Sequence, residues 1–234
     1  MDERVTVSGV WREALTIIRR YPLATLVPPV ILAALGDAPY YFLKDSGFGW
    51  EQILTFITSA FAYYFYVAYA EEIAVEAERG TDRITVRGML RELQQAAPIV
   101  PPVIVASVAA ITVPTAATGL LVLPGVWLLT RWSLLAPVIS RERLRPVEAL
   151  KRSYGLVRGR FELVFLTATF AFILEEAIIH AGASVGLLIT DSDTWGEWAG
   201  ATISASLITP LAALATSVTY QRLTTHGILR REDQ

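Results

Sequence analysis

The sequence predicts an all-α integral membrane protein with six transmembrane helices, arranged as three hairpins that are each preceded by a cytoplasmic amphipathic interfacial helix. Composition, long uncharged stretches and a one-sided distribution of basic residues support this prediction. Of 234 residues, 53% are hydrophobic and 18% are charged, whereas a soluble domain has about 25% charged residues. The mean hydropathy is +0.46. The length fits one compact bundle, so we expect a single domain over residues 1–234.

The uncharged stretches set the number of spans, because one transmembrane helix needs about 20 mostly apolar residues. Arg131 is the only charged residue between positions 93 and 140, and this stretch is too long for one span. The Pro124-Gly125 pair favours a turn inside it. The six predicted spans are 21–43, 52–70, 97–118, 122–140, 163–189 and 198–221.

The basic residues predict the orientation of these spans. Nearly all of the 20 Lys and Arg residues precede span 1, lie between spans 2 and 3 or between spans 4 and 5, or follow span 6. Basic residues in short loops stay cytoplasmic, so we expect a multi-pass plasma membrane protein with both termini in the cytoplasm. The first twenty residues mix charged and apolar groups at helical spacing, which is unlike a secretory signal peptide.

Amphipathic basic segments precede the odd-numbered spans, at about 7–20, 84–95 and 146–158. In the third, Pro146 suits a first helical turn, and the apolar stripe contains Val147, Leu150, Tyr154 and Val157. Such a helix either lies in the membrane interface and attracts anionic lipid or packs on the bundle, and both interpretations stay open. The residues expected to contact anionic lipid are Arg145, Lys151, Arg152, Arg158 and Arg160.

Paired prolines occur in two spans. Pro28-Pro29 and Pro101-Pro102 are each followed by four similar apolar residues, which favours an internal duplication. A proline inside a helix frees the carbonyl four residues earlier for a neighbour or a cavity. A proline in the first turn of a helix has no such effect, and the sequence leaves both interpretations open.

Ionisable residues inside the spans predict a midplane polar cluster. A charge at the centre of a span costs about 2.5–3.5 kcal/mol, so such residues usually face the bundle and find partners. Arg131 is therefore expected to meet Glu175, Glu176 or Asp37, and His180 shares a helix face with Glu176. The cluster would be a structural ion pair, a contact for an anion such as a lipid phosphate, or a site for a proton or metal ion.

Enzyme chemistry is not predicted. The EE-x-x-x-H spacing from Glu175 to His180 is similar to the EE-x-x-x-R motif of intramembrane CAAX proteases, but that family needs further histidines in other spans and only His226 remains. The chain has no cysteine, which excludes thiolate chemistry and disulfides. We expect no catalytic residues, no metal site, no cofactor and no nucleic-acid partner.

Small residues predict close helix packing near the end of span 5 and the start of span 6. Gly182 with Gly186, and Gly196 with Gly200, are each four residues apart, the spacing that lets helix backbones approach closely. These glycines would pack the two spans against each other. They would otherwise mediate a homo-oligomer or contact a membrane-protein partner.

The stretch 119–161 resembles a known family of membrane domains. It contains the Pro124-Gly125 break, Arg131-Trp132-Ser133, Ala136-Pro137-Val138 and the segment 149–153, ALKRS. These features resemble the membrane domain that is fused to some glycerophosphodiester phosphodiesterases and also occurs alone in uncharacterised bacterial and archaeal membrane proteins. The resemblance implies a six-helix membrane fold. It does not imply phosphodiesterase activity, because catalysis in the fused proteins is attributed to a separate soluble domain.

These observations favour a non-enzymatic membrane protein that binds lipid or a membrane partner. One alternative is a small transporter coupled to protons, ions or a solute, with a midplane polar site. A second alternative is an intramembrane enzyme. A sealed ion-pair cluster would favour the first function, and a hydrated path through the polar groups would favour the transporter.

Overall fold

The computed structural model describes residues 5–43, 50–80, 102, 105, 122–190 and 193–232. Regular secondary structure in these residues is entirely helical. The elements are α1 (Val7–Arg20), α2 (Pro22–Leu43), α3 (Trp50–Glu78), α6 (Val122–Trp132), α7 (Leu135–Glu142), α8 (Pro146–Val157), α9 (Phe161–Val164), the π-helix η2 (Phe165–Thr169), α10 (Phe170–Ile189) and α11 (Asp193–Glu232).

Three helices are long and apolar enough to cross a membrane, namely Pro22–Leu43, Phe161–Ile189 and Asp193–Thr225. They coincide with the predicted spans 1, 5 and 6, and they suggest a membrane location. The predicted span 2 falls within α3, which has 29 residues but is less apolar because of its tyrosines. The predicted span 3 (97–118) and the interfacial helix 84–95 lie outside the described residues, apart from Pro102 and Val105.

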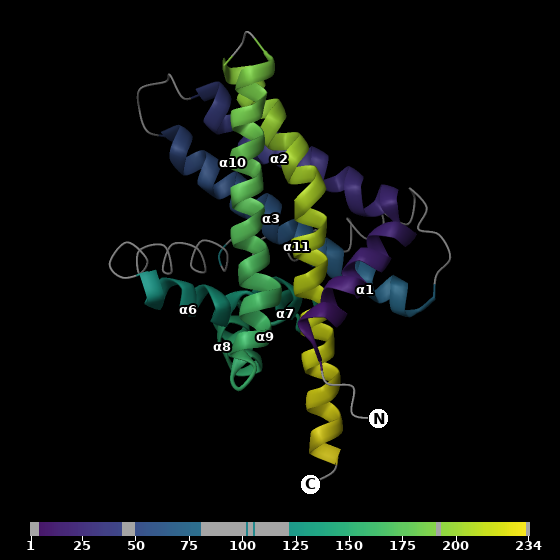
Figure 1. Ribbon diagram of the computed structural model, residues 1–234. Coiled ribbons are helices and arrows are strands. Elements are labelled where there is room, and N and C mark those ends of the chain that lie inside the picture. The colour runs from purple at the N-terminus through teal and green to yellow at the C-terminus, as the bar shows by residue number, and fades with distance from the viewer. Residues whose placement is uncertain are drawn as a thin grey trace.

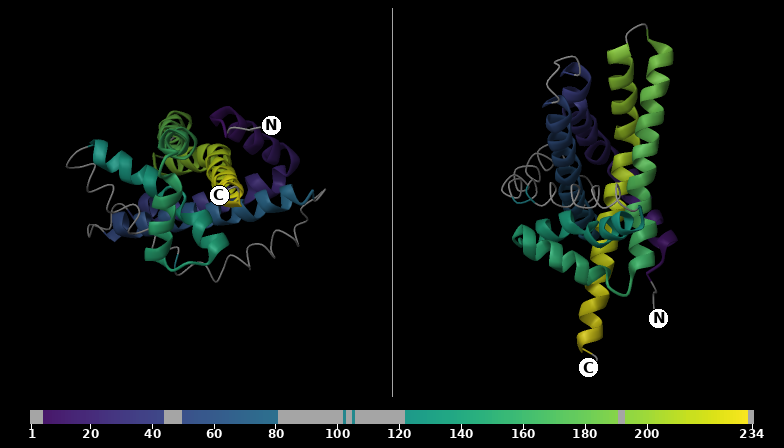
Figure 2. Two further views of the ribbon diagram at one scale, coloured as in Figure 1. Left: turned by 90° about the horizontal axis from the view of Figure 1, so that it is seen from below. Right: turned by 90° about the vertical axis from the view of Figure 1, so that its left-hand side faces the viewer.

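The helices form an upright bundle that is broadest near its middle, and the end of α11 extends below the other helices (Figure 1). α10 and α11 run antiparallel along its length, α2 and α3 form a second hairpin that crosses them, and α1 packs beside α11. α6 and α8 run across the lower part of the bundle rather than along it (Figure 2). The start of α1 and the end of α11 both lie at the lower end, in agreement with the prediction that both termini are on one side.

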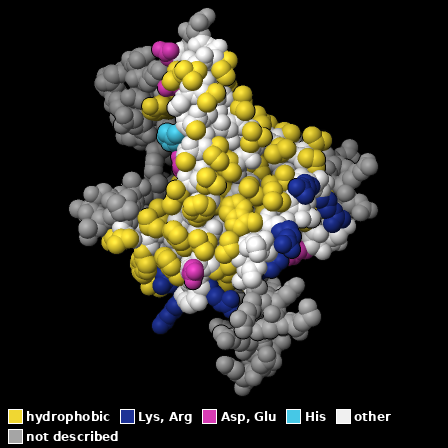
Figure 3. All heavy atoms as spheres, viewed as in Figure 1, with side chains coloured by type: hydrophobic (Ala, Val, Ile, Leu, Met, Phe, Trp, Pro, Cys, Tyr) yellow, Lys and Arg dark blue, Asp and Glu magenta, His cyan; other side chains and the backbone are white. Residues whose placement is uncertain are grey.

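Apolar and basic side chains separate along the bundle (Figure 3). Hydrophobic side chains cover most of the upright part of this face, whereas the Lys and Arg side chains lie on its lower half. The outer face of α10 exposes Phe170, Ile173 and Val185, which suits contact with lipid tails. This separation agrees with a bundle whose lower end faces the cytoplasm.

The proline pair of α2 lies inside the helix and is compensated by α3. Pro28 and Pro29 have no N–H to donate to the carbonyls of Ala24 and Thr25, four residues earlier. The Tyr69 hydroxyl donates to Ala24 O over 3.0 Å, and the Tyr66 hydroxyl donates to Thr25 O over 2.6 Å. Of the two interpretations that the sequence left open, the structure therefore supports the one in which the freed carbonyls serve a neighbouring helix, because this pair lies beyond the first turn of α2.

The four glycines pack α10 against α11. A Cβ atom at Gly186 would overlap the backbone carbonyl of Gly196, and one at Gly200 would overlap the carbonyl of Gly182. Only glycine lets the two backbones lie this close. The structure therefore confirms that these residues pack spans 5 and 6 together.

The expected fourth span, 122–140, is not one helix. α6 ends at Trp132 and α7 begins at Leu135, so each piece is too short to cross about 30 Å of hydrocarbon at 1.5 Å per residue. Pro137 explains the break, because its ring clashes with the carbonyl of Ser133 and cannot donate to it. The prediction of a continuous span was wrong here because it gave hydropathy more weight than the effect of this proline.

A π-helical turn marks the start of the fifth span. In η2 the Thr169 hydroxyl donates to Thr130 of α6 over 3.0 Å, and Thr167 accepts from Thr219 of α11 over 3.0 Å. All four threonines are buried. The widened turn therefore joins the transverse helix α6 to the long helix α11 through buried hydroxyl groups.

Candidate functional site

Arg131, near the end of α6, is surrounded by aromatic rings. Its guanidinium carbon lies 4.6 Å from the ring centre of Tyr154, 5.1 Å from that of Trp127 and 5.8 Å from that of Phe161. Cation–π attraction acts at distances up to about 6 Å, so all three rings stabilise the cation. Its Nη1 also approaches the backbone carbonyl of Tyr154 at 3.5 Å. The rings hold the cation without neutralising it.

The residues described in the structure place no carboxylate within ion-pair distance of Arg131, and its buried Nε has no hydrogen-bond partner among them. Glu175 follows Phe161 by fourteen positions on the same long helix. At 1.5 Å per residue this corresponds to about 20 Å along the axis. The expected pairing of Arg131 with Glu175, Glu176 or Asp37 is therefore corrected, because the break at Ser133 directs α6 across the lower end of the bundle.

α8 presents one face to the bundle and another outward. Ala149, Ser153 and Val157 are buried, and the Ser153 hydroxyl donates to the Arg131 carbonyl over 2.9 Å. The small side chains allow α8 to pack closely. Part of the predicted apolar stripe points outward instead, with Val147 62% exposed and Tyr154 40% exposed. α8 is therefore both a packing element and an outward-facing amphipathic helix.

Two of the predicted lipid-contacting residues share the outward face of α8. Lys151, Tyr154 and Arg158 are spaced three and four residues apart, which places them on one side of a helix, and all three are exposed. Because the guanidinium of Arg131 lies over the Tyr154 ring, it adds a third cationic side chain to those of Lys151 and Arg158 at this face. We call Arg131, Lys151, Tyr154 and Arg158 the basic–aromatic face.

The remaining predicted lipid contacts differ in their surroundings. Arg152 points to Glu142 of α7, with its Nε 2.9 Å from both carboxylate oxygens, so its charge is neutralised. Arg145 precedes α8 and its N–H donates to Glu148 over 3.3 Å. Arg145 and Arg160 are exposed at the two ends of α8. Arg152 therefore has a structural role, while the other two remain accessible.

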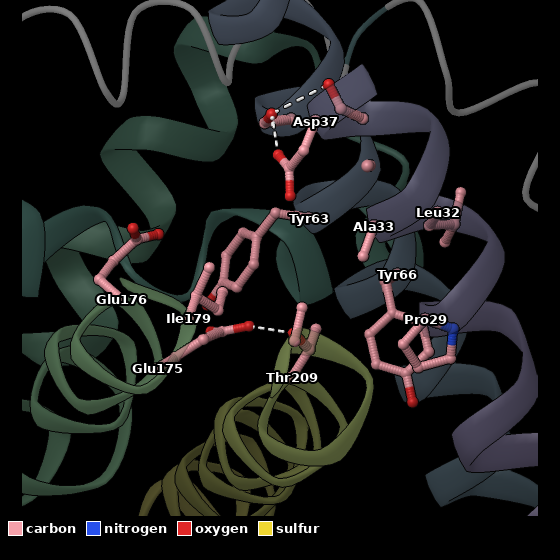
Figure 4. Close-up of a pocket in the computed structure, with 14 residues that line it drawn as sticks. Pro29, Leu32, Ala33, Asp37, Tyr63, Tyr66, Glu175, Glu176, Ile179 and Thr209 are labelled. Atoms are coloured by element: carbon pink, nitrogen blue, oxygen red, sulfur yellow. Dashed lines mark hydrogen bonds between the residues drawn. The ribbon is translucent and has the colours of Figure 1, made fainter. Parts of the chain in front are cut away.

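A cavity of about 90 Å³ lies between α2, α3, α10 and α11. Three of the predicted cluster residues line it, Asp37, Glu175 and Glu176, and Figure 4 shows them on different sides of one space, with the ring of Tyr63 between Asp37 and Glu175. Pro29 also lines this cavity. The fold thus brings together carboxylates from two hairpins.

Hydroxyl groups orient two of these carboxylates. Ser59 of α3 donates to Asp37 Oδ1 over 2.8 Å, and Thr209 of α11 donates to Glu175 Oε1. Glu175 is only 2% exposed, and its Oε2 atom has no partner among the described residues. Glu176 is exposed at the rim of the cavity. The cavity therefore contains a buried carboxylate oxygen without a donor.

His180 lies next to the carboxylates of the cavity. It lies close enough to interact electrostatically with both Asp37 and Glu176. Its Nδ1 is 2.8 Å from the Glu176 carbonyl, a distance at which a protonated Nδ1 donates to that oxygen. The structure thus gathers four of the five predicted cluster residues and excludes Arg131. No three His, Cys, Asp or Glu side chains in the described segments lie close enough to hold a metal ion by themselves.

A third polar group lies at the lower end of α3, beyond the predicted span 52–70. Glu71 is fully buried, accepts from Gln221 of α11 over 3.1 Å, and lies 3.4 Å from the Arg141 Nε of α7. Burial raises the pKa of Glu71 to about 7, and the bond from Gln221 and the charge of Arg141 oppose that rise. The acidic lower end of α3 therefore faces a basic side chain of α7.

Several residues of these sites were not singled out from the sequence. The rings of Trp127 and Phe161 surround Arg131, and Ser59 and Thr209 orient the cavity carboxylates. The spacing of Lys151, Tyr154 and Arg158 could have identified the outward face of α8. The two hydroxyl contacts join different helices, so no local pattern reveals them.

Comparison of the chain with family models, with curated proteins and with solved structures gives no match. The resemblance of the stretch 119–161 to the membrane domain of glycerophosphodiester phosphodiesterases therefore stays a prediction. The functional argument rests on the geometry of the sites described above.

Proposed function

We propose that this protein is a non-enzymatic plasma membrane protein that binds anionic lipid headgroups at its cytoplasmic surface, through the basic–aromatic face of α6 and α8. The observation that carries the proposal is the state of Arg131. Its cation is stabilised by three aromatic rings and has no carboxylate partner in the described part of the chain. An unneutralised guanidinium suits a phosphate, which it recognises with two parallel hydrogen bonds.

The surroundings of Arg131 support a lipid as the source of that phosphate. Lys151 and Arg158 add two exposed cations on the same helix face, and each basic residue near an anionic membrane contributes about 1 kcal/mol of attraction. The exposed side chains of Val147 and Tyr154 would insert beside the headgroup. α8 runs across the bundle, which is the orientation that an interfacial helix needs.

The test is lipid binding by the full chain, measured by native mass spectrometry after release from detergent that contains equal amounts of phosphatidylglycerol and phosphatidylcholine. We expect the wild-type protein to retain phosphatidylglycerol preferentially. Arg131→Gln should reduce that preference at least fivefold, and Arg131→Lys should reduce it less because the charge remains. Arg12→Gln is the matched control, since Arg12 is exposed on α1 and does not belong to the basic–aromatic face.

Equal retention of both lipids by the wild-type protein would contradict the proposal. So would an equal loss in Arg12→Gln and Arg131→Gln, because the attraction would then be a general effect of positive charge. Competition by inorganic phosphate at millimolar concentration, with no lipid preference, would assign the site to a soluble anion instead.

A further inference from the structure

The cavity between α2, α3, α10 and α11 is lined by polar side chains of one chemical kind. Each of these side chains presents oxygen, as carboxylate or hydroxyl groups, and the rest of the lining is apolar or aromatic. Neither a lysine, an arginine nor an amide side chain is among the lining residues. Oxygen-rich surroundings are those that hard cations prefer in proteins.

The charges around the cavity do not balance. Asp37, Glu175 and Glu176 would contribute three negative charges if ionised, and His180 is the one basic side chain shown to interact with them in the described structure. Even a charged imidazole would leave an excess of negative charge. Because a buried charge without compensation is expensive in a low-dielectric interior, protons on the carboxylates or a bound cation must offset this excess.

Glu175 provides a second observation, independent of the charge imbalance, that points to a bound ligand. It is 2% exposed and lines the cavity, yet its Oε2 atom has no hydrogen-bond partner among the described residues. Thr209 holds the other oxygen of the same carboxylate, so the group cannot rotate freely to find a donor elsewhere. An oxygen fixed in this way is suited to a cation or to a water molecule that hydrates one.

We propose that this cavity binds a small hard metal cation at the free carboxylate oxygen of Glu175, with water completing its coordination and linking it to Asp37 across the cavity. Water is needed because no three carboxylate or imidazole side chains in the described residues converge closely enough to hold a metal alone. A volume of about 90 Å³ accommodates an ion with several waters, since one water needs about 10–15 Å³ on this scale. The residues involved are separate from those of the basic–aromatic face, so the two proposals can fail independently.

The experiment measures thermal unfolding of the full chain in nanodiscs of phosphatidylcholine, at constant pH and ionic strength. Na⁺, K⁺, Mg²⁺ or Ca²⁺ replaces N-methyl-D-glucamine stepwise, and the fluorescence of the six tryptophans reports unfolding. A cation that binds the folded state raises the melting temperature with its concentration. We expect at least one of the four cations to do so, and Glu175→Gln to require at least tenfold more of that cation for the same shift.

Glu71→Gln is the matched control, because Glu71 is also a buried carboxylate but lies outside the cavity. It should retain the wild-type cation response. If Glu175→Gln does not fold, Asp37→Asn replaces it, and isothermal titration of the wild-type protein measures binding directly. Absence of any cation response in the wild-type protein would overturn the proposal, as would an unchanged response in the cavity variants. A second series varies the pH without added metal cations. A melting temperature that responds to pH but to none of the four cations would also overturn the proposal, because protons would then neutralise the carboxylates.

Discussion

The Tyr66 hydroxyl donates a 2.6 Å hydrogen bond to the backbone carbonyl of Thr25, which is the carbonyl that Pro29 leaves without a helical donor. Tyr69 serves the carbonyl of Ala24 in the same way. α3 therefore supplies the donors that α2 lacks, and both prolines remain inside a continuous helix. In a membrane, where water cannot solvate a free carbonyl, this compensation matters more than in a soluble protein.

The first prediction concerns this pair. Tyr66→Phe should lower the free energy of unfolding by about 1–3 kcal/mol, because it leaves a buried acceptor unsatisfied. In a Pro29→Ala background the loss should be smaller, since residue 29 regains the N–H that can donate to Thr25. Thermal unfolding of the two single variants and the double variant gives the coupling. Tyr40→Phe, at an exposed tyrosine, is the control, and an equal effect of Tyr66→Phe in both backgrounds would contradict the explanation.

The second prediction concerns the contact of α10 with α11. Gly186→Ala should separate the two helices and lower the melting temperature strongly, because its Cβ atom would overlap the Gly196 carbonyl. Gly155→Ala in α8 is the matched control, since nothing lies within 4 Å of a Cβ atom there, and alanine is favoured over glycine in a helix. Similar melting temperatures for the two variants would mean that the close backbone contact does not form.

The third prediction concerns pH. The pKa of Glu71 is raised from 4.5 to about 7 in the folded protein, so the folded state favours the protonated carboxyl. Its contribution to stability is complete below about pH 4.5 and is lost as the pH rises through 7, by an amount of about 3 kcal/mol at most.

Glu71→Gln should remove this dependence, because the amide stays neutral and can still accept from Gln221. The measurement is the difference in melting temperature between the variant and the wild-type protein from pH 5 to pH 8, which cancels the other titrating groups. A difference that stays constant across this range would show that Glu71 has the same charge throughout.

The fourth prediction concerns orientation and uses the absence of cysteine from the chain. Lys151→Cys should react with a membrane-impermeant maleimide only from the cytoplasmic side, because α8 belongs to the basic end of the bundle. Asp193→Cys should react only from the opposite side, since α11 begins there. Both positions are exposed. Labelling of inside-out and right-side-out vesicles distinguishes the two, and labelling of both positions from one side would contradict the proposed topology.

Some features of this fold could be predicted because they depend on short stretches of sequence. The apolar runs identified α2, the α9–α10 segment and α11 as candidate spans, and the glycine spacing identified the contact between α10 and α11. The effect of Pro137 was equally local and could have been predicted, since a proline interrupts the helix at the carbonyl four residues earlier. The assignment of 122–140 to one span gave hydropathy more weight than backbone chemistry.

The candidate sites were predicted only in part, because their geometry depends on how distant helices cross. Asp37 and Glu175 are far apart in the sequence, and they line one cavity because the α2–α3 hairpin crosses the α10–α11 pair. Arg131 was placed with them on the rule that charges inside a membrane find opposite charges. It lies instead against aromatic rings, which satisfy a cation through a different interaction.

The sequence by itself determined which helices are long and apolar enough to cross a membrane and on which side the basic residues gather. The hydropathy and charge of each residue decide whether it is more stable in lipid or in water. The sequence also determined which backbone carbonyls of α2 would need an outside donor. Only the tertiary structure decided that Tyr66 and Tyr69 are those donors, that three carboxylates share a cavity, and that Arg131 packs against α8. These outcomes depend on the crossing of helices that are remote in the chain, and no local pattern encodes which side chains meet there.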